Sequence, residues 1–223
     1  MKLITALVST TLAANTVFDG KCPQNPAFSE NFDLEAYMGR WYNIANLPAS
    51  FQFEGNTCGI ADYTLRPDSV VTVRNSEKMN WSFLAWLNIR QSVTGTASPD
   101  LQNGEVKGLD VRFYSRDQDL SFKESTYNVL DTDNDDFRYV WSCNEMPANE
   151  CKWWHRFFGG CGPERHELYL WIITRDAQKG INDYEEHMDK IEQLWDADYD
   201  FDQVRDAMLP MAHDDCRGYE SGF

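Results

Sequence analysis

The chain has 223 residues, a formal net charge of −16 at pH 7, 42% hydrophobic residues and 14% aromatic residues. This length suits one large domain, and the negative charge argues against nucleic acid or anionic membranes as partners, because phosphate binding needs clusters of Lys and Arg. The eight tryptophans offer flat, rigid walls for an apolar ligand, although a large ordinary core would use them too.

The first 14 residues have the pattern of a signal peptide. Lys2 gives a positive start, residues 3–14 are short and mostly apolar, and Ala13 and Ala14 offer small side chains for cleavage. No later segment has about 18 consecutive apolar residues, so we expect no membrane span. The sequence therefore predicts a protein secreted into the extracellular space, with a polar lead-in over residues 15–30.

Short runs with alternating, β-branched and aromatic residues then predict strands. Turn residues separate many of these runs, for example at Ser98-Pro99-Asp100 and Asn134-Asp135-Asp136. About eight consecutive strands with short turns predict a barrel or a sandwich. The expected strands cover residues 41–47, 59–65, 70–75, 82–89, 92–97, 106–114, 126–131, 137–143 and 168–174.

The pattern changes near the C-terminus. Ile181, Tyr184, Met188 and Ile191 follow helical spacing with charges between them. Asn182 or Asp183 can cap the start of this helix. A shorter helix is expected over residues 201–208, and a tail over residues 217–223. With no internal repeat and no linker, the layout is a set of strands followed by a helix.

The number of cysteines fits a secreted chain. An even number behind a signal peptide predicts three disulfides, and the spacing matches no zinc site. Six cysteines allow many pairings, so the residues alone leave the connectivity open. The cysteines are Cys22, Cys58, Cys143, Cys151, Cys161 and Cys216.

Three segments resemble the motifs of the lipocalin family, in the order in which that family has them. Residues 31–42 resemble the first motif, with its Gly-x-Trp at Gly39 and Trp41. Thr132-Asp133 resembles the second motif, although Asn134 stands where Tyr is usual, and the strand that ends at Cys143 resembles the strand that follows. Residues 170–175 resemble the third motif, marked by Arg175. The resemblance covers residues 22 to 216 and is greatest to apolipoprotein D-like lipocalins, with crustacyanins and bilin-binding lipocalins nearby.

The resemblance implies an all-β fold, an eight-stranded antiparallel up-and-down barrel over residues 31–216 with a C-terminal α-helix packed outside. Trp41 would lie across the closed end, and Arg175 would stack on it in a cation–π contact that is structural rather than catalytic. The family also implies the disulfides Cys22–Cys143 and Cys58–Cys216. Cys151 and Cys161 are then left to each other and would close an aromatic loop.

Side-chain alternation along the strands assigns a cavity. If Trp41 and Arg175 point inward, their alternate neighbours do too, and Trp171 then matches a pocket aromatic of the apolipoprotein D-like lipocalins. Cys143 is tied to the outer N-terminal segment and should point outward, so Val140 and Ser142 should point inward. A β-bulge would invert any of these assignments. The expected ligand-binding residues are Asn43, Ala45, Leu47, Phe51, Phe53, Val140, Ser142, Tyr169, Trp171 and Ile173.

These residues and the resemblance predict a carrier, not an enzyme. The expected ligand is a fatty acid, sterol, bilin or carotenoid, and no catalytic motif is present. We expect no metal site, because Asp131-x-Asp133-x-Asp135 lacks the Gly and Glu of a calcium loop. The four histidines are expected at the surface.

Two alternatives stay open. The aromatic loop of residues 151–161 can present Trp153, Trp154, Phe157 and Phe158 to a partner, as a homo- or hetero-oligomer. A lipocalin-type isomerase would need a free thiolate in the cavity, whereas all six cysteines have plausible partners. Asn80-Trp81-Ser82 fits the N-glycosylation sequon, and its use is left open.

Overall fold

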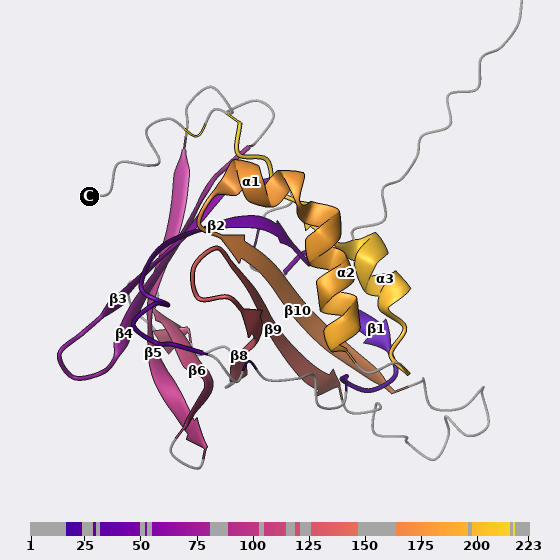
Figure 1. The fold of residues 1–223 in the computed structure, drawn as a ribbon, viewed down its shortest axis with the longest axis horizontal. Coiled ribbons are helices and arrows are strands. Elements are labelled where there is room, and N and C mark those ends of the chain that lie inside the picture. Colours follow the sequence, from indigo (N-terminus) through magenta and orange to yellow (C-terminus); the bar gives the residue numbers. More distant parts are fainter. Residues whose placement is uncertain are drawn as a thin grey trace, which may run out of the picture.

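Eight long antiparallel strands form a closed barrel in the computed structural model (Figure 1). The structure describes residues 17–23, 29, 32–49, 52, 55–80, 89–102, 105–114, 119–120, 126–146, 164–195, 198–214 and 216. Each barrel strand pairs with the next, and pairing between the last and the first closes the sheet. The eight strands are β2 (Gly39–Asn46), β3 (Thr57–Leu65), β4 (Val71–Lys78), β5 (Arg90–Gln102), β6 (Glu105–Tyr114), β8 (Thr126–Thr132), β9 (Phe137–Met146) and β10 (Arg165–Thr174).

Three short strands lengthen the sheet at its margins. They are β1 (Val17–Asp19), which pairs with β10, β7 (Asp119–Leu120), which pairs with β6, and β11 (Leu209–Pro210), which pairs with β2. The fold class expected from the sequence, an eight-stranded barrel with a helix outside, is confirmed. The signal peptide, residues 82–88 of one expected strand, the loop of residues 151–161 and the tail lie outside the described residues.

Three helices lie along one side of the barrel, outside the sheet (Figure 1): α1 (Ala177–Asn182), α2 (Tyr184–Leu194) and α3 (Phe201–Ala207). The helical region begins earlier than the periodicity predicted, because Asp176 caps α1 by accepting a hydrogen bond from the Lys179 amide at 3.0 Å. Among the described helices, none has the length and apolar character that crossing a bilayer requires. The helices pack on β2, β8, β9 and β10 through Leu130, Leu168, Leu170, Ile172, Met188, Ile191, Trp195, Phe201 and Val204.

A β-bulge in β2 decides which of its side chains face the interior. Asn43 and Ala45 pair with consecutive residues of β10, so Ile44 between them is the extra residue. The bulge shifts the alternation by one position. Ala45 and Leu47 therefore belong to the core under the helices, and the inward direction expected for both is wrong. Asn46 takes the place opposite Trp171 on β10 instead.

Another expectation fails in β5. Ser98-Pro99-Asp100 was expected as a turn, but the three residues lie within the strand and pair with β6. Pairing between β4 and β5 ends at Ala97, so Pro99 has a neighbouring strand on one side only. Proline is tolerated there because its missing N–H is not needed on the open side.

The turn between β8 and β9 is built by the second lipocalin-like motif. One carboxylate oxygen of Asp133 accepts hydrogen bonds from the backbone amides of residues 135–137 at 2.8–3.1 Å. Burial acts to raise the pKa of Asp133, but these hydrogen bonds outweigh it and lower the pKa. Asn134 has a φ of +66°, a conformation that Asn tolerates better than most residues. The motif is therefore a turn, and its carboxylate is directed at the backbone.

Two disulfides tie the outer segments to the barrel. Cys22 bonds to Cys143 on β9, and Cys58 at the start of β3 bonds to Cys216, with Cα–Cα distances of 5.9 and 5.6 Å. These are the two pairs that the family resemblance implied. The Cys58 bridge holds the C-terminal segment against β2 and β3, where the Met211 amide donates to the Ile44 carbonyl at 2.7 Å.

Candidate functional site: the barrel cavity

The closed end of the barrel is a packed floor around Trp41, which has no exposed surface. The guanidinium carbon of Arg175 lies 3.6 Å from the centroid of the Trp41 ring, the contact that the family resemblance implied. The Trp41 indole N–H donates to the Tyr37 carbonyl at 3.0 Å. Arg175 in turn donates to the carbonyls of Ala36, Met38 and Arg40 at 2.6–2.8 Å.

Two further residues of the floor have a clear physical role. Arg138 is fully buried and places its guanidinium carbon 3.9 Å from the centroid of the Trp41 ring. Sequence reasoning missed it, although it alternates with Val140 and Ser142, which were expected to point inward. Gly39 has a φ of +92°, and a Cβ there would lie 3.2 Å from Arg175 Nη1. The first motif therefore needs a glycine two residues before its tryptophan.

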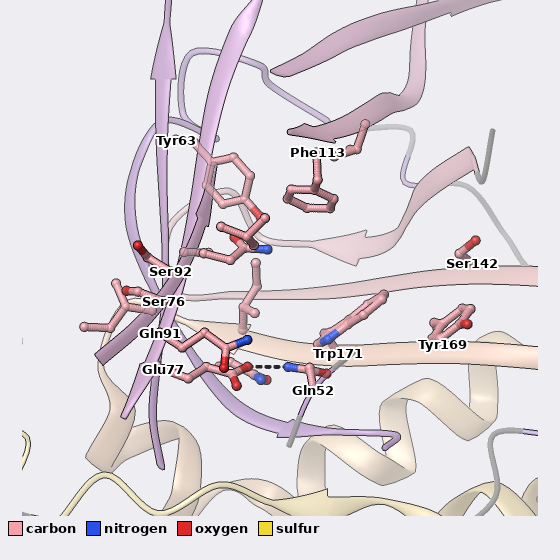
Figure 2. A pocket seen from close by; sticks show the side chains of 18 of the residues that line it. Gln52, Tyr63, Ser76, Glu77, Gln91, Ser92, Phe113, Ser142, Tyr169 and Trp171 are labelled. Atoms are coloured by element: carbon pink, nitrogen blue, oxygen red, sulfur yellow. Dashed lines mark hydrogen bonds between the residues drawn. The ribbon is translucent and has the colours of Figure 1, made fainter. Parts of the chain in front are cut away.

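Above this floor the barrel encloses a cavity of about 510 Å³. Its lining comes from most of the barrel strands and from Gln52, in the segment after β2. Figure 2 shows Tyr169 and Trp171 projecting into the cavity from β10, and Glu77 joined to Gln52. The lining residues are Asn43, Gln52, Gly59, Ile60, Ala61, Tyr63, Asn75, Ser76, Glu77, Gln91, Ser92, Val93, Val111, Phe113, Ser142, Asn144, Glu167, Tyr169, Trp171 and Ile173.

Aromatic rings form much of the apolar wall. The rings of Tyr169 and Trp171 stack with centroids 5.9 Å apart and planes 9° from parallel. Tyr63 and Phe113 line another part of the cavity (Figure 2), and the Tyr63 ring packs edge-on against Tyr37 of the floor at 4.8 Å. Such rings bury a large apolar area with little loss of side-chain entropy, which suits a wall that contacts a flat or extended apolar molecule.

A chain of amide side chains forms the polar wall toward the mouth. The Asn56 amide donates to the Glu77 carboxylate at 2.7 Å, and the Gln52 amide donates to the same carboxylate. The Asn46 amide donates to Gln52 Oε1 at 3.3 Å, and the Asn43 amide donates to Asn46 Oδ1 at 2.9 Å. The chain thus connects a carboxylate at the mouth with an asparagine deeper in the cavity.

Three buried oxygen atoms of lining residues have no hydrogen-bond partner among the described residues. They are Asn43 Oδ1, Asn75 Oδ1 and Ser142 Oγ. Asn43 is 7% exposed and Ser142 is 4% exposed, so neither side chain has ready access to bulk solvent. A buried polar atom without a partner costs free energy, which a ligand donating a hydrogen bond would recover.

Of the expected ligand-binding residues, five line the cavity: Asn43, Ser142, Tyr169, Trp171 and Ile173. Val140 points inward but lies in the packed apolar layer around Trp41. Ala45 and Leu47 lie outside the barrel wall, as described above, and Phe51 and Phe53 lie outside the described residues. That the five residues contact a ligand remains a prediction.

Sequence reasoning missed the lining residues of β3 to β6, such as Tyr63, Glu77 and Phe113. Their strands were expected and show alternation, but no motif in them indicates which alternate set faces inward. Once the pairing is known, the set follows from the inward-facing Trp41, because Trp41 lies opposite Ala61 and Ala61 opposite Asn75.

Two of the histidines expected at the surface are buried instead. Both lie under the outer layer and not in the cavity. His166 contacts the Gly20 carbonyl at 3.0 Å and the Tyr199 hydroxyl at 2.7 Å, and His187 contacts the Tyr139 hydroxyl at 2.8 Å. Burial lowers the pKa of both imidazoles. Polar partners under the helices account for their position, which no local pattern revealed.

Comparison with known proteins agrees with this architecture. The family model described as a Lipocalin-like domain matches residues 32–155. Apolipoprotein D of Rattus norvegicus is 32% identical over 167 residues, which cover 75% of this chain and 72% of that protein. The chain belongs to the lipocalin family.

Two other matches extend over more of the chain. Bilin-binding protein of Pieris brassicae is 27% identical over 190 residues, covering 82% of this chain and 84% of that protein. Among solved structures, insecticyanin of the tobacco hornworm Manduca sexta superposes with a TM-score of 0.61 at 16% identity, covering 90% of each chain. This structural likeness supports the barrel fold of the lipocalin.

Proposed function

We propose that this lipocalin is an extracellular, non-enzymatic carrier that binds one small hydrophobic molecule inside its barrel. The observation that carries this proposal is the cavity of about 510 Å³, which has an aromatic wall and a short polar wall. That volume falls in the range of small-molecule sites, which are mostly apolar with a few placed polar groups. The candidate classes of ligand are fatty acids, sterols, bilins and carotenoids.

Burial of apolar surface supplies the affinity. At about 25 cal/mol per Å², a few hundred Å² of ligand surface contribute several kcal/mol before the cost of ordering. The stacked rings of Tyr169 and Trp171 provide a flat contact surface for this burial. The relative from Pieris brassicae is named for bilin binding, which makes a coloured ligand one of the candidates to test.

The extracellular setting is supported by the two disulfides, because such bonds persist in oxidising compartments. The non-enzymatic reading is supported by the relatives, which are an apolipoprotein and a binding protein by name. The four cysteines that the structure describes are paired in these two bonds, so they offer no thiolate to a catalytic mechanism of the isomerase type.

The proposal is tested on protein purified natively from its source. Mass spectrometry of an organic extract should find one class of small apolar molecule at close to one per chain, and an absorption band in the visible range would identify a pigment. Delipidated protein should then bind diphenylhexatriene, an apolar dye whose fluorescence rises in a dry site. Protein that carries no such molecule and does not bind the dye would contradict the carrier function.

A further inference from the structure

The polar wall has a fixed hydrogen-bond direction. The carbonyl of Leu47 only accepts, so the Asn46 side chain, 2.7 Å away, must direct its NH₂ group there and keep its oxygen for Asn43. Asn43 therefore donates through its own NH₂ group, and its Oδ1 is left without a partner among the described residues. The Glu77 carboxylate fixes Gln52 in the same sense, because a carboxylate accepts from the Gln52 NH₂ group.

The consequence is an interior that accepts hydrogen bonds. Asn43 lines the cavity, is more than nine-tenths buried, and offers an acceptor oxygen that cannot be exchanged for a donor by rotating the amide. Asn75 adds a second buried oxygen without a partner among the described residues, and the hydroxyl of Ser142 can take either role. A ligand that satisfies these atoms must bring a hydrogen-bond donor.

The charge of the lining points the same way. The described lining residues include two carboxylates, Glu77 and Glu167, and none of them is Lys, Arg or His. Arg90 is not among the lining residues, although it is close in sequence to Gln91, and it donates to the hydroxyl of the lining residue Ser76 at 2.5 Å. An anionic ligand end would therefore meet like charge at two partly buried carboxylates, where repulsion is stronger than in bulk water.

Resting on the proposed carrier function, the geometry points to a narrower ligand class: amphiphiles whose polar end donates hydrogen bonds and carries no negative charge. Alcohols and amines belong to this class, and free fatty acids do not. Glu77 selects against anions, and Asn43 receives the donated hydrogen bond. Glu77 also orients Gln52, whereas the Leu47 carbonyl orients Asn46 and, through it, Asn43.

The experiment compares three ligands with the same alkyl chain. Dodecanol, dodecylamine and dodecanoate, each below its micelle concentration, displace diphenylhexatriene from the delipidated full-length protein at pH 8. We expect the alcohol and the amine to bind at least about tenfold more tightly than the carboxylate. Equal or tighter binding of dodecanoate would overturn the selectivity while leaving the carrier function intact. Absence of binding by the dye and by all three ligands would overturn both.

Two variants assign the selectivity to residues. Glu77→Gln should tighten dodecanoate binding about tenfold and change dodecanol binding by less than about twofold. Glu145→Gln is the matched control, because it removes an exposed carboxylate near the mouth end of β9, outside the lining. If both variants leave the ratio of acid to alcohol affinity unchanged, the assignment to Glu77 is wrong.

Asn43→Leu removes the acceptor oxygen and keeps a similar volume. Dodecanol binding should weaken about five- to tenfold, while binding of diphenylhexatriene, which has no polar group, should stay within about twofold of wild type. Retained dye binding also shows that the variant is folded. Dodecanol binding equal to that of the wild type would overturn the role of Asn43.

Discussion

The two ends of the barrel are held together by different means. At the closed end, Trp41 is buried against Arg175 and Arg138, and Arg175 donates to three backbone carbonyls. In the cavity above the floor, buried oxygen atoms of Asn43 and Ser142 lack partners among the described residues. Both described disulfides attach in the open half, to the start of β3 and to the later part of β9.

This difference separates stability from binding. The floor packs the fully buried Trp41 ring against two guanidinium groups, so it contributes to the free energy of folding. The cavity has buried oxygen atoms without partners among the described residues, so free energy is gained when a ligand donates hydrogen bonds to them. Covalent bonds to the outer segments then hold the open half in place. The residues of the family motifs lie mainly at the floor, whereas the polar wall of the cavity carries no motif.

The largest expected effect is at the floor. Trp41→Ala should lower the free energy of unfolding by about 3–5 kcal/mol, because it removes a fully buried ring and both cation–π contacts. Urea denaturation followed by far-ultraviolet circular dichroism measures the change. A loss below about 1 kcal/mol would show that the floor is not the main stabilising region of the barrel.

The disulfide of the open half comes next. Replacing both Cys58 and Cys216 by Ser should lower the free energy of unfolding by about 2–4 kcal/mol, because the bridge restricts the unfolded chain. It should also release the C-terminal segment that Met211 ties to β2, which hydrogen exchange at the Met211 amide can detect. If stability and exchange stay as in the wild type, the open half does not depend on this bridge.

A cavity residue should behave in the opposite way from Trp41. Trp171 is half-buried at the cavity wall, so Trp171→Ala should lower stability by only about 1 kcal/mol. Affinity for diphenylhexatriene should fall about tenfold, because the stacked surface with Tyr169 is lost. Urea denaturation and titration with diphenylhexatriene are carried out on both Trp41→Ala and Trp171→Ala, so that each variant is the matched control for the other. A stability loss as large as that of Trp41→Ala, with unchanged dye affinity, would remove the distinction between floor and cavity.

The smallest expected effect is the pH dependence of stability that comes from His187, which is buried under the outer helices. Burial lowers the pKa of His187, so the unfolded chain binds protons first as the pH falls below about 6.5. The stability that depends on neutral His187 is therefore complete above that pH and is lost as the pH falls toward the lowered value. The neighbouring groups are the Tyr139 hydroxyl and the charged side chains Lys190, Asp183, Glu186 and Asp133.

Denaturation of the wild type and of His187→Gln from pH 7.5 to about pH 5 tests this dependence. The variant should lose less stability over this interval than the wild type, because Gln does not titrate. Parallel curves for the two proteins would show that His187 is equally easy to protonate in the folded and unfolded chains.

Local patterns in the sequence predicted the strands and the C-terminal helices, and the resemblance to lipocalins implied the barrel and the contact of Trp41 with Arg175. Alternating residues show strands, helical spacing shows the outer layer, and the three lipocalin-like motifs identify the closed end. Trp171 and Tyr169 followed from the third motif, because β10 alternates regularly back from Arg175 to both residues. The pairing of Cys22 with Cys143 followed from the resemblance and not from spacing.

Only the tertiary structure decided which polar side chains meet in the cavity. The bulge at Ile44 depends on how β2 pairs with β10, and one extra residue reverses every later side chain of that strand. The link from Glu77 through Gln52 to Asn43 joins residues that are far apart in sequence and share no periodicity. Alternation and motifs are properties of one strand, whereas register and hydrogen-bond direction are set between strands. The sequence therefore determined the barrel, and the tertiary structure determined which polar groups line the cavity.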